Sequence, residues 1–225
     1  MNIIELKELT KIYKETEIEV IAIDNLTLNI KEGEFTAIVG PSGSGKTTLL
    51  NLIGGLDKPT KGEIIINSTD ICKLKPRQLV DFRLNNIGFV FQSYNLIPVL
   101  TAAENVEFIM HLQNKPKKER TERTYEVLNS VGLADRMDSR PAKLSGGQQQ
   151  RVAVARALAS KPKFVLADEP TANLDSKSAE NLLDIMLKLN LENNITFIFS
   201  THDQRVMNKA RRIITLEDGK IKNDE

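Results

Sequence analysis

The residues from Gly40 to Thr47 have the types and the spacing of a phosphate-binding loop. They read GPSGSGKT and match the pattern G-x-x-x-x-G-K-[ST]. Glycines let the backbone curl so that successive N–H groups point at phosphate oxygens. The Lys46 ammonium can reach the β- and γ-phosphates of a nucleotide, and the Thr47 hydroxyl can ligate Mg²⁺. We expect a nucleoside triphosphate site formed by Gly40, Pro41, Ser42, Gly43, Ser44, Gly45, Lys46, Thr47 and Thr48.

Two carboxylates follow a second apolar run, in the segment KFVLADE that ends at Glu169. A run of this kind predicts a buried strand, and ligands bind at the carboxyl ends of strands in open α/β sheets. We expect Asp168 to hold Mg²⁺, through water, and Glu169 to orient and polarise an attacking water molecule. The alternative is a solvated helix start, where acidic residues are favoured by the helix dipole.

Gln92 and His202 end two further apolar runs, IGFVF and ITFIFS-T. The His202 ring could donate a hydrogen bond to the γ-phosphate, and the Gln92 amide could sense Mg²⁺ or the attacking water. Each residue alone is ambiguous, and we interpret His111 as an ordinary surface residue. Four apolar runs that all end in groups able to contact phosphate or metal favour a single catalytic edge.

The segment LSGGQ predicts a second anion site. Small residues, a hydroxyl and free N–H groups stand at the start of a helix expected to run to about Ser160. The alternative is a glycine-rich helix start capped by serine. The residues proposed to bind the anion are Ser145, Gly146, Gly147 and Gln148.

Length, charge and composition exclude several classes of protein. A chain of 225 residues fits a single domain, and its 31 basic and 30 acidic residues give no reason to expect a nucleic-acid partner. Cys72 is the only cysteine, so neither a disulfide framework nor a cysteine-based zinc cluster is expected. The first residues do not read as a signal peptide, and no apolar run approaches the length of a membrane span. We expect a cytoplasmic protein.

Strands and helices that would position these motifs can be read along the chain. Two alternating segments within residues 2–30 predict antiparallel strands, residues 74–86 predict a helix, and DG at 218–219 predicts a hairpin turn. Residues 93–143 lack strand signals and predict a helical subdomain within one domain spanning 1–225. Thr101 and Glu104 predict a capping box there, whereas the charged residues 114–123 are interpreted as a solvated face and connection. Strand and helix then alternate, which indicates a parallel α/β sheet.

Together these motifs resemble the nucleotide-binding domain of ATP-binding cassette (ABC) proteins. The resemblance covers nearly the whole chain, and LSGGQ between a phosphate loop and an Asp-Glu pair is highly specific to that family. Other segments resemble the subgroup that serves lipoprotein release, macrolide export and antimicrobial-peptide resistance. Asn173 stands where many relatives have serine. The segments that carry the resemblance are GPSGSGKT, FVFQSYNLIP, LTAAENV, LSGGQ, GGQQQRVAVARAL, ADEPTANLD and His202.

The resemblance implies a fold, a reaction and partners. The fold is that of a P-loop NTPase: a mostly parallel core sheet, an antiparallel β subdomain and an inserted α-helical subdomain. The reaction is Mg²⁺-dependent ATP hydrolysis, with Tyr13 stacked on adenine. Ser145 would bind the γ-phosphate held by a second copy in a head-to-tail dimer, with Asp175 at the interface. The dimer would drive an integral membrane permease for export or extraction, from the inner face of the cell membrane.

Two other classes of function remain to be weighed against this one. A soluble ABC-type ATPase acting on chromosomes or ribosomes would need a long coiled-coil insert or two such domains in one chain. A phosphate-loop kinase or GTPase would leave LSGGQ unexplained. For the permease, we expect the apolar segment Tyr94–Thr101 to receive a short helix, with packing inside the helical subdomain as the alternative.

Overall fold

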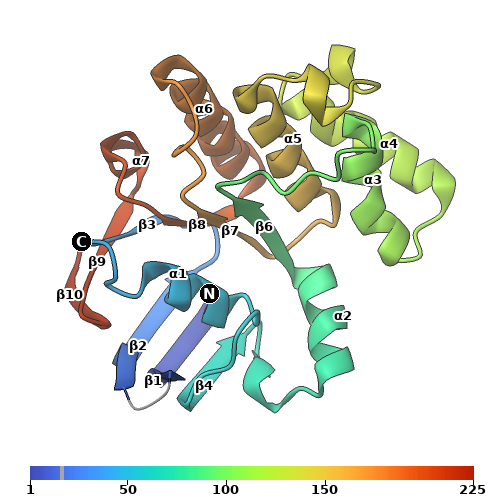
Figure 1. Cartoon of the computed structure of the whole chain (residues 1–225). Coiled ribbons are helices and arrows are strands. Elements are labelled where there is room, and N and C mark those ends of the chain that lie inside the picture. Colours follow the sequence, from blue (N-terminus) through green and yellow to red (C-terminus); the bar gives the residue numbers. More distant parts are fainter. Residues whose placement is uncertain (16–17) are drawn as a thin grey trace.

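A six-stranded sheet forms the centre of the molecule, as the computed structural model shows for residues 1–15 and 18–225 (Figure 1). The strand order is β10-β9-β3-β8-β7-β6, with β10 antiparallel to β9 and the other neighbours parallel. The strand bounds are β3 Phe35–Val39, β6 Ile87–Phe91, β7 Phe164–Asp168, β8 Thr196–Ser200, β9 Arg212–Glu217 and β10 Lys220–Asp224. The mostly parallel sheet predicted from the alternating segments is confirmed.

A second, antiparallel sheet has the order β2-β1-β4-β5. Its strands are β1 Asn2–Glu15, β2 Ile18–Lys31, β4 Lys61–Ile66 and β5 Thr69–Asp70. Buried side chains of this sheet, such as Leu6 and Ile66, form one apolar core with Leu49 and Leu52 of the helix α1 (Lys46–Ile53) and with one face of the central sheet. The antiparallel strands predicted within residues 2–30 are therefore confirmed.

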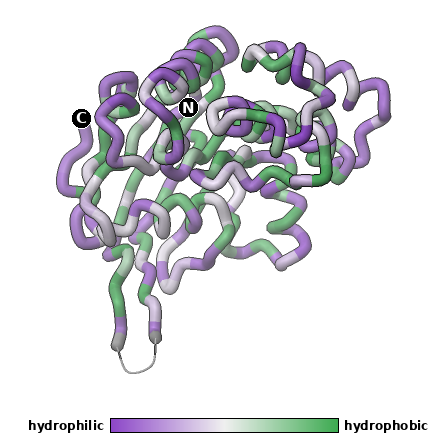
Figure 2. Tube along the Cα trace, turned by 45° about the horizontal axis from the view of Figure 1, so that its top comes forward, coloured by the Kyte–Doolittle hydropathy of each residue, from purple (hydrophilic) through white to green (hydrophobic). Residues whose placement is uncertain are grey.

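The remaining helices lie on the other side of the central sheet or beyond its β6 edge (Figure 1). Their bounds are α2 Pro76–Asn86, α3 Ala102–Leu112, α4 Lys117–Ser130, α5 Gly146–Ala159, α6 Ser176–Asn193 and α7 Gln204–Lys209. Apolar residues of α3, α4, α5 and α6 form a second core with Phe35, Phe197 and Phe199 of the sheet. In Figure 2 the strands inside are largely hydrophobic, whereas the margin where Figure 1 places α4 is largely hydrophilic.

Two local predictions were wrong or incomplete. The charged residues 114–123 do not form a connection throughout, because α4 begins at Lys117, directly after Pro116. Its charges are compatible with a helix because they pair at helical spacing, as Lys118 does with Glu122 at 3.9 Å. The short helix α7 after β8 was not predicted. By contrast, the capping box of Thr101 and Glu104 at the start of α3 is confirmed.

Candidate functional site

The four polar segments predicted to form a catalytic edge follow four neighbouring parallel strands. These strands are β3, β8, β7 and β6, in that spatial order. The phosphate loop follows β3, His202 follows β8, and Gln92 follows β6. Asp168 ends β7, and Glu169 comes directly after it. Since the strands are parallel, their carboxyl ends meet at one edge of the sheet.

The phosphate loop has the backbone geometry that its glycines predict. Gly43 and Gly45 adopt positive φ values of 82° and 100°. A Cβ at Gly45 would lie 2.4 Å from the Ala22 carbonyl oxygen, whereas one at Gly43 would meet nothing within 4 Å, so the loop is open there. The Lys46 ammonium donates to the carbonyl oxygens of Gly40 and Pro41, at 2.8 and 2.9 Å. This loop can surround a phosphate group with N–H donors and a cation.

The turn between β9 and β10, at Gly219, is hydrogen-bonded to the backbone of the phosphate loop. The Gly219 N–H in the β9–β10 turn donates to the Ser44 carbonyl at 3.1 Å, and the Gly219 carbonyl accepts from the Asp24 N–H at 3.0 Å. A Cβ at Gly40 would lie 2.1 Å from the Leu216 carbonyl oxygen. The loop is thus held by segments that stand at opposite ends of the chain.

Thr47 and Asp168 bring two oxygen ligands together from different elements. The Thr47 hydroxyl at the start of α1 donates to Asp168 Oδ1 at the end of β7, at 3.2 Å. A hydroxyl and a carboxylate beside a phosphate cradle are the hard oxygen donors that Mg²⁺ takes together with substrate phosphates. This donor set fits a magnesium ion.

Glu169 is held in an uncommon backbone conformation next to His202. Its φ is 46°, which lies in the left-handed region that a non-glycine residue rarely adopts. Its N–H donates to the Ser200 carbonyl at 2.9 Å, its Oε1 lies 2.7 Å from His202 Nδ1, and its Oε2 accepts from the Thr201 hydroxyl at 3.4 Å. The Glu169 side chain is 17% exposed and that of His202 is 74% exposed. The largely buried Glu169 carboxylate is therefore held by residues at the end of β8 and just after it. The imidazole of His202 lies beside it and is accessible to solvent.

A network around Asp203 fixes the segment that carries His202, and sequence reasoning missed it. Asp203 accepts hydrogen bonds from the Arg205 guanidinium and from the Thr171 hydroxyl, the latter at 2.6 Å. The bonds from Arg205, followed by that from Thr171, outweigh burial and lower the Asp203 pKa to about 2. Thr171 lies just after Glu169 in the chain, so this network joins the segments that follow β7 and β8.

Gln92 is paired with Asn173 by two reciprocal amide hydrogen bonds. Gln92 Nε2 donates to Asn173 Oδ1 at 3.4 Å, and Asn173 Nδ2 donates to the Gln92 carbonyl at 3.1 Å. The Tyr94 hydroxyl donates to the Asn173 carbonyl at 3.4 Å. Arg156 of α5 donates to the carbonyls of Tyr94 and Asn95, and its burial lowers its pKa. The loop after β6 is therefore tied both to α5 and to the segment before α6.

Ser145 caps α5 as the alternative interpretation of LSGGQ supposed. Its hydroxyl accepts from the Gln148 N–H at 3.3 Å, and its own N–H donates to Gln148 Oε1 at 2.9 Å. The two glycines also have a packing reason. A Cβ at Gly146 would lie 2.8 Å from the Tyr94 hydroxyl oxygen, and one at Gly147 would lie 2.9 Å from Ser178 Cβ. In the described part of the chain, no hydrogen bond joins Ser145 or Gln148 to the phosphate loop.

Gln150 was also missed, although it is fully buried at the catalytic edge. Its Nε2 donates to the carbonyls of Phe91 and Pro170, at 3.2 and 2.8 Å. Phe91 ends β6 and Pro170 follows Glu169, so one side chain of α5 fixes two strand ends.

Tyr13 lies on β1, where its hydroxyl donates to Asp57 Oδ2 at 2.8 Å. Asp175 caps α6 by accepting from the Ser178 N–H, and its hydrogen bonds with Ser178 lower its pKa.

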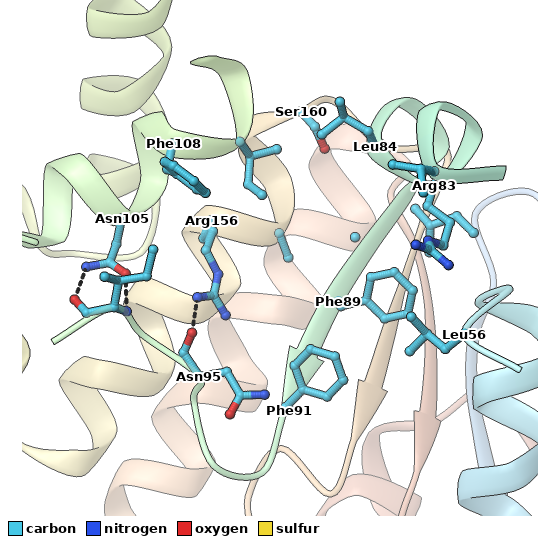
Figure 3. Close-up of a pocket in the computed structure, with 16 residues that line it drawn as sticks. Leu56, Arg83, Leu84, Phe89, Phe91, Asn95, Asn105, Phe108, Arg156 and Ser160 are labelled. Carbon is cyan, nitrogen blue, oxygen red and sulfur yellow. Dashed lines mark hydrogen bonds between the residues drawn. The ribbon is translucent and has the colours of Figure 1, made fainter. Parts of the chain in front are cut away.

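An apolar cavity of about 450 Å³ opens between α2, β6, α3 and α5 (Figure 3). Phe89 and Phe91 project into it from β6, Phe108 from α3 and Arg156 from α5. Of the predicted contact segment Tyr94–Thr101, Ile97 lines the cavity, Val99 is exposed and Leu96 packs against the sheet core.

None of the helices within the described residues combines the length and the apolar composition of a membrane span.

Comparison with known proteins identifies the family. Residues 23–172 match the family model described as ABC transporter. The chain is 48% identical over 224 residues to an uncharacterized ABC transporter ATP-binding protein of Thermotoga maritima, covering 100% of this chain and 95% of that protein. It is 46% identical over 224 residues to the macrolide export ATP-binding/permease protein MacB of Mannheimia succiniciproducens, covering 100% of this chain and 35% of that protein.

A solved structure agrees with these relatives. The dimeric structure of a post-hydrolysis state of the ATP-binding cassette MJ0796, bound to ADP and Pi, has a TM-score of 0.90 and 47% sequence identity. The match covers 99% of this chain and 97% of that one, and the MJ0796 protein is from Methanocaldococcus jannaschii. Motifs, fold and relatives agree, and this chain belongs to the ABC transporter family, as one of its ATPase domains.

Proposed function

We propose that this chain is the Mg²⁺-dependent ATPase subunit of an exporter or extraction complex, acting as a head-to-tail dimer on a membrane permease. Residues 1–225 would form one nucleotide-binding domain, with residues 93–143 as its helical subdomain. The observation that carries the proposal is the convergence of Lys46, Thr47, Asp168, Glu169 and His202 at the carboxyl ends of neighbouring strands.

Each residue at this edge has a role that its chemistry supports. Lys46 and the backbone N–H groups of Gly40 and of residues 42–48 would hold the phosphates of ATP. Thr47 and Asp168 would hold Mg²⁺, with Gln92 nearby to sense it. Bound Mg²⁺ would supply charge neutralisation on the β- and γ-phosphate oxygens. Glu169 would accept a proton from the attacking water, while His202 would contact the γ-phosphate.

A dimer is supported by the presence of two anion-binding helix starts and only one lysine-bearing loop in the chain. In the proposed pair, Ser145, Gly146, Gly147 and Gln148 of one copy would bind the γ-phosphate held by Lys46 of the other. Hydrolysis would remove the group that joins the two copies. The cassette to which this chain is similar has a dimeric structure with ADP and Pi bound, which is consistent with this arrangement.

The permease partner is supported by the apolar cavity beside β6. Phe108 and Val80 are 40% and 51% exposed at its margin, although side chains of this type are normally buried. A short amphipathic helix of the permease could insert there, close to Gln92, and would hold the subunit at the inner face of the membrane. The name of the relative MacB combines macrolide export, ATP binding and permease, which supports an export role.

The proposal is tested by Glu169→Gln, which preserves size and hydrogen bonding but removes the carboxylate. We expect steady-state ATP hydrolysis to fall at least about 100-fold, as for loss of one preorganised catalytic group, while ATP binding persists. Glu180→Gln on the exposed side of α6 is the matched control and should hydrolyse ATP normally. Near-normal turnover by the Glu169 variant would remove this residue from the proposed role.

A further inference from the structure

The Tyr13 side chain is restrained more tightly than an ordinary strand residue. Its hydroxyl donates to Asp57 Oδ2 at 2.8 Å, and it also lies against the Thr48 hydroxyl. The Lys11 ammonium lies 4.7 Å from the centre of the Tyr13 ring and donates to Asp57 Oδ1 at 2.7 Å. The Lys11 side chain is only 12% exposed and also donates to the Lys58 carbonyl at 2.8 Å. The ring is thus fixed at its hydroxyl and covered on one face.

Two of the groups that hold the ring lie in or just after the helix that begins in the phosphate loop. Thr48 lies in the first turn of α1, next to Thr47. Asp57 follows the end of the same helix, where its N–H donates to the Asn51 carbonyl at 3.3 Å. Tyr13 is therefore set by contacts with both ends of the element that begins with Lys46. Burial, followed by the hydrogen bond to Asp57, raises the pKa of the Tyr13 phenol above its usual value.

We propose that Asp57, assisted by Lys11, is a positioning residue that holds the Tyr13 ring for stacking on the nucleotide base. This inference rests on the stacking of Tyr13 on adenine that the resemblance to ABC proteins implies. Because the ammonium of Lys11 covers one face of the ring, the base stacks on the other face. Because Thr48 belongs to the proposed phosphate-binding segment and Asp57 follows the helix that begins there, the ring is held in place relative to that segment. The nucleotide then meets a stacking surface that needs no further ordering.

The test compares ADP with pyrophosphate, two ligands that share the phosphates and differ in the nucleoside. Their dissociation constants are measured by calorimetry on the full chain, and the ratio of the two reports the contribution of the base. Tyr13→Ala should reduce the preference for ADP about tenfold, as for loss of one aromatic stack. Tyr13→Phe and Asp57→Ala should each reduce it about threefold, because an unrestrained ring must be ordered on binding.

Three comparisons separate positioning from a general structural effect. The double variant Tyr13→Phe with Asp57→Ala should prefer ADP over pyrophosphate as strongly as either single variant does, because both substitutions remove the same hydrogen bond. Asp57→Asn, which retains an oxygen acceptor, should recover much of the preference. Asp81→Asn, at an exposed carboxylate of α2, is the control and should change nothing.

Each outcome supports or overturns a distinct claim. An unchanged preference in Tyr13→Ala would overturn the base-stacking role and the positioning role with it. A reduced preference in Tyr13→Ala with a normal one in Asp57→Ala would overturn only the inference about Asp57. Equal losses of ADP and pyrophosphate affinity in Asp57→Ala would also refute positioning, because the phosphate loop itself would then be disturbed.

Discussion

Replacing Asp203 by Asn should destabilise the protein in a way that depends on pH. The carboxylate accepts hydrogen bonds from the Arg205 guanidinium and the Thr171 hydroxyl, and its side chain is 14% exposed. These bonds lower its pKa from 3.8 to about 2 in the folded protein. The ionised carboxylate therefore stabilises the folded protein. Asparagine cannot ionise, so the variant loses this contribution.

The size of the effect follows from that difference in pKa. One pKa unit corresponds to about 1.4 kcal/mol, so the charge of Asp203 contributes about 2 kcal/mol to the free energy of unfolding at pH 7. A lowered carboxyl pKa stabilises fully above the unfolded value of 3.8 and loses its effect as the pH falls toward about 2. Linkage gives a remaining contribution of about 1 kcal/mol at pH 3.

Urea denaturation at pH 7 and pH 3 measures both quantities. The difference in unfolding free energy between the wild type and Asp203→Asn should fall by about half between the two pH values. Asp81→Asn, at an exposed position on α2, should show almost no difference at either pH. A loss for Asp203→Asn that is the same at pH 7 and pH 3 would show that the carboxylate charge is not the source of the stability.

Three further outcomes are expected. Gln150→Leu should lower the unfolding free energy in urea by about 2 kcal/mol, since a buried backbone carbonyl loses its donor, and unchanged stability would contradict this. Mixing Lys46→Ala with Ser145→Arg should restore part of the ATPase activity that neither variant has alone, whereas a monomer in sedimentation with full activity would exclude shared sites. With Cys72 replaced by Ser, a cysteine at Phe108 should crosslink to the co-expressed permease, and capture only from other faces would refute docking at the cavity.

The mostly parallel central sheet and the polar segments at its strand ends could be predicted because their signals are local. The runs Phe35–Val39, Phe164–Asp168 and Thr196–Ser200 are mostly apolar and almost entirely buried, as expected for strands covered on both faces. The polar groups of the site stand at the end of each run or directly after it. The phosphate loop is equally local, since its glycines, lysine and threonine are consecutive in the chain.

The contacts that sequence reasoning missed join distant segments of the chain. Tyr13 and Asp57 are 44 positions apart, and Gln92 and Asn173 are 81 positions apart, so no spacing rule links them. Gln150 reads as one of three consecutive glutamines, and only packing reveals that it alone is fully buried among them. The helix α7 has six residues, too few for a periodic signal beside the His202 motif.

The contact between the Gly219 turn and the phosphate loop has a consequence for regulation. The turn is hydrogen-bonded to the Ser44 carbonyl, and the strand β10 follows it directly. A binding protein that displaces β10 would therefore shift the backbone of the loop that we propose to hold the phosphates. Such a partner would be expected to change nucleotide affinity without contacting the nucleotide.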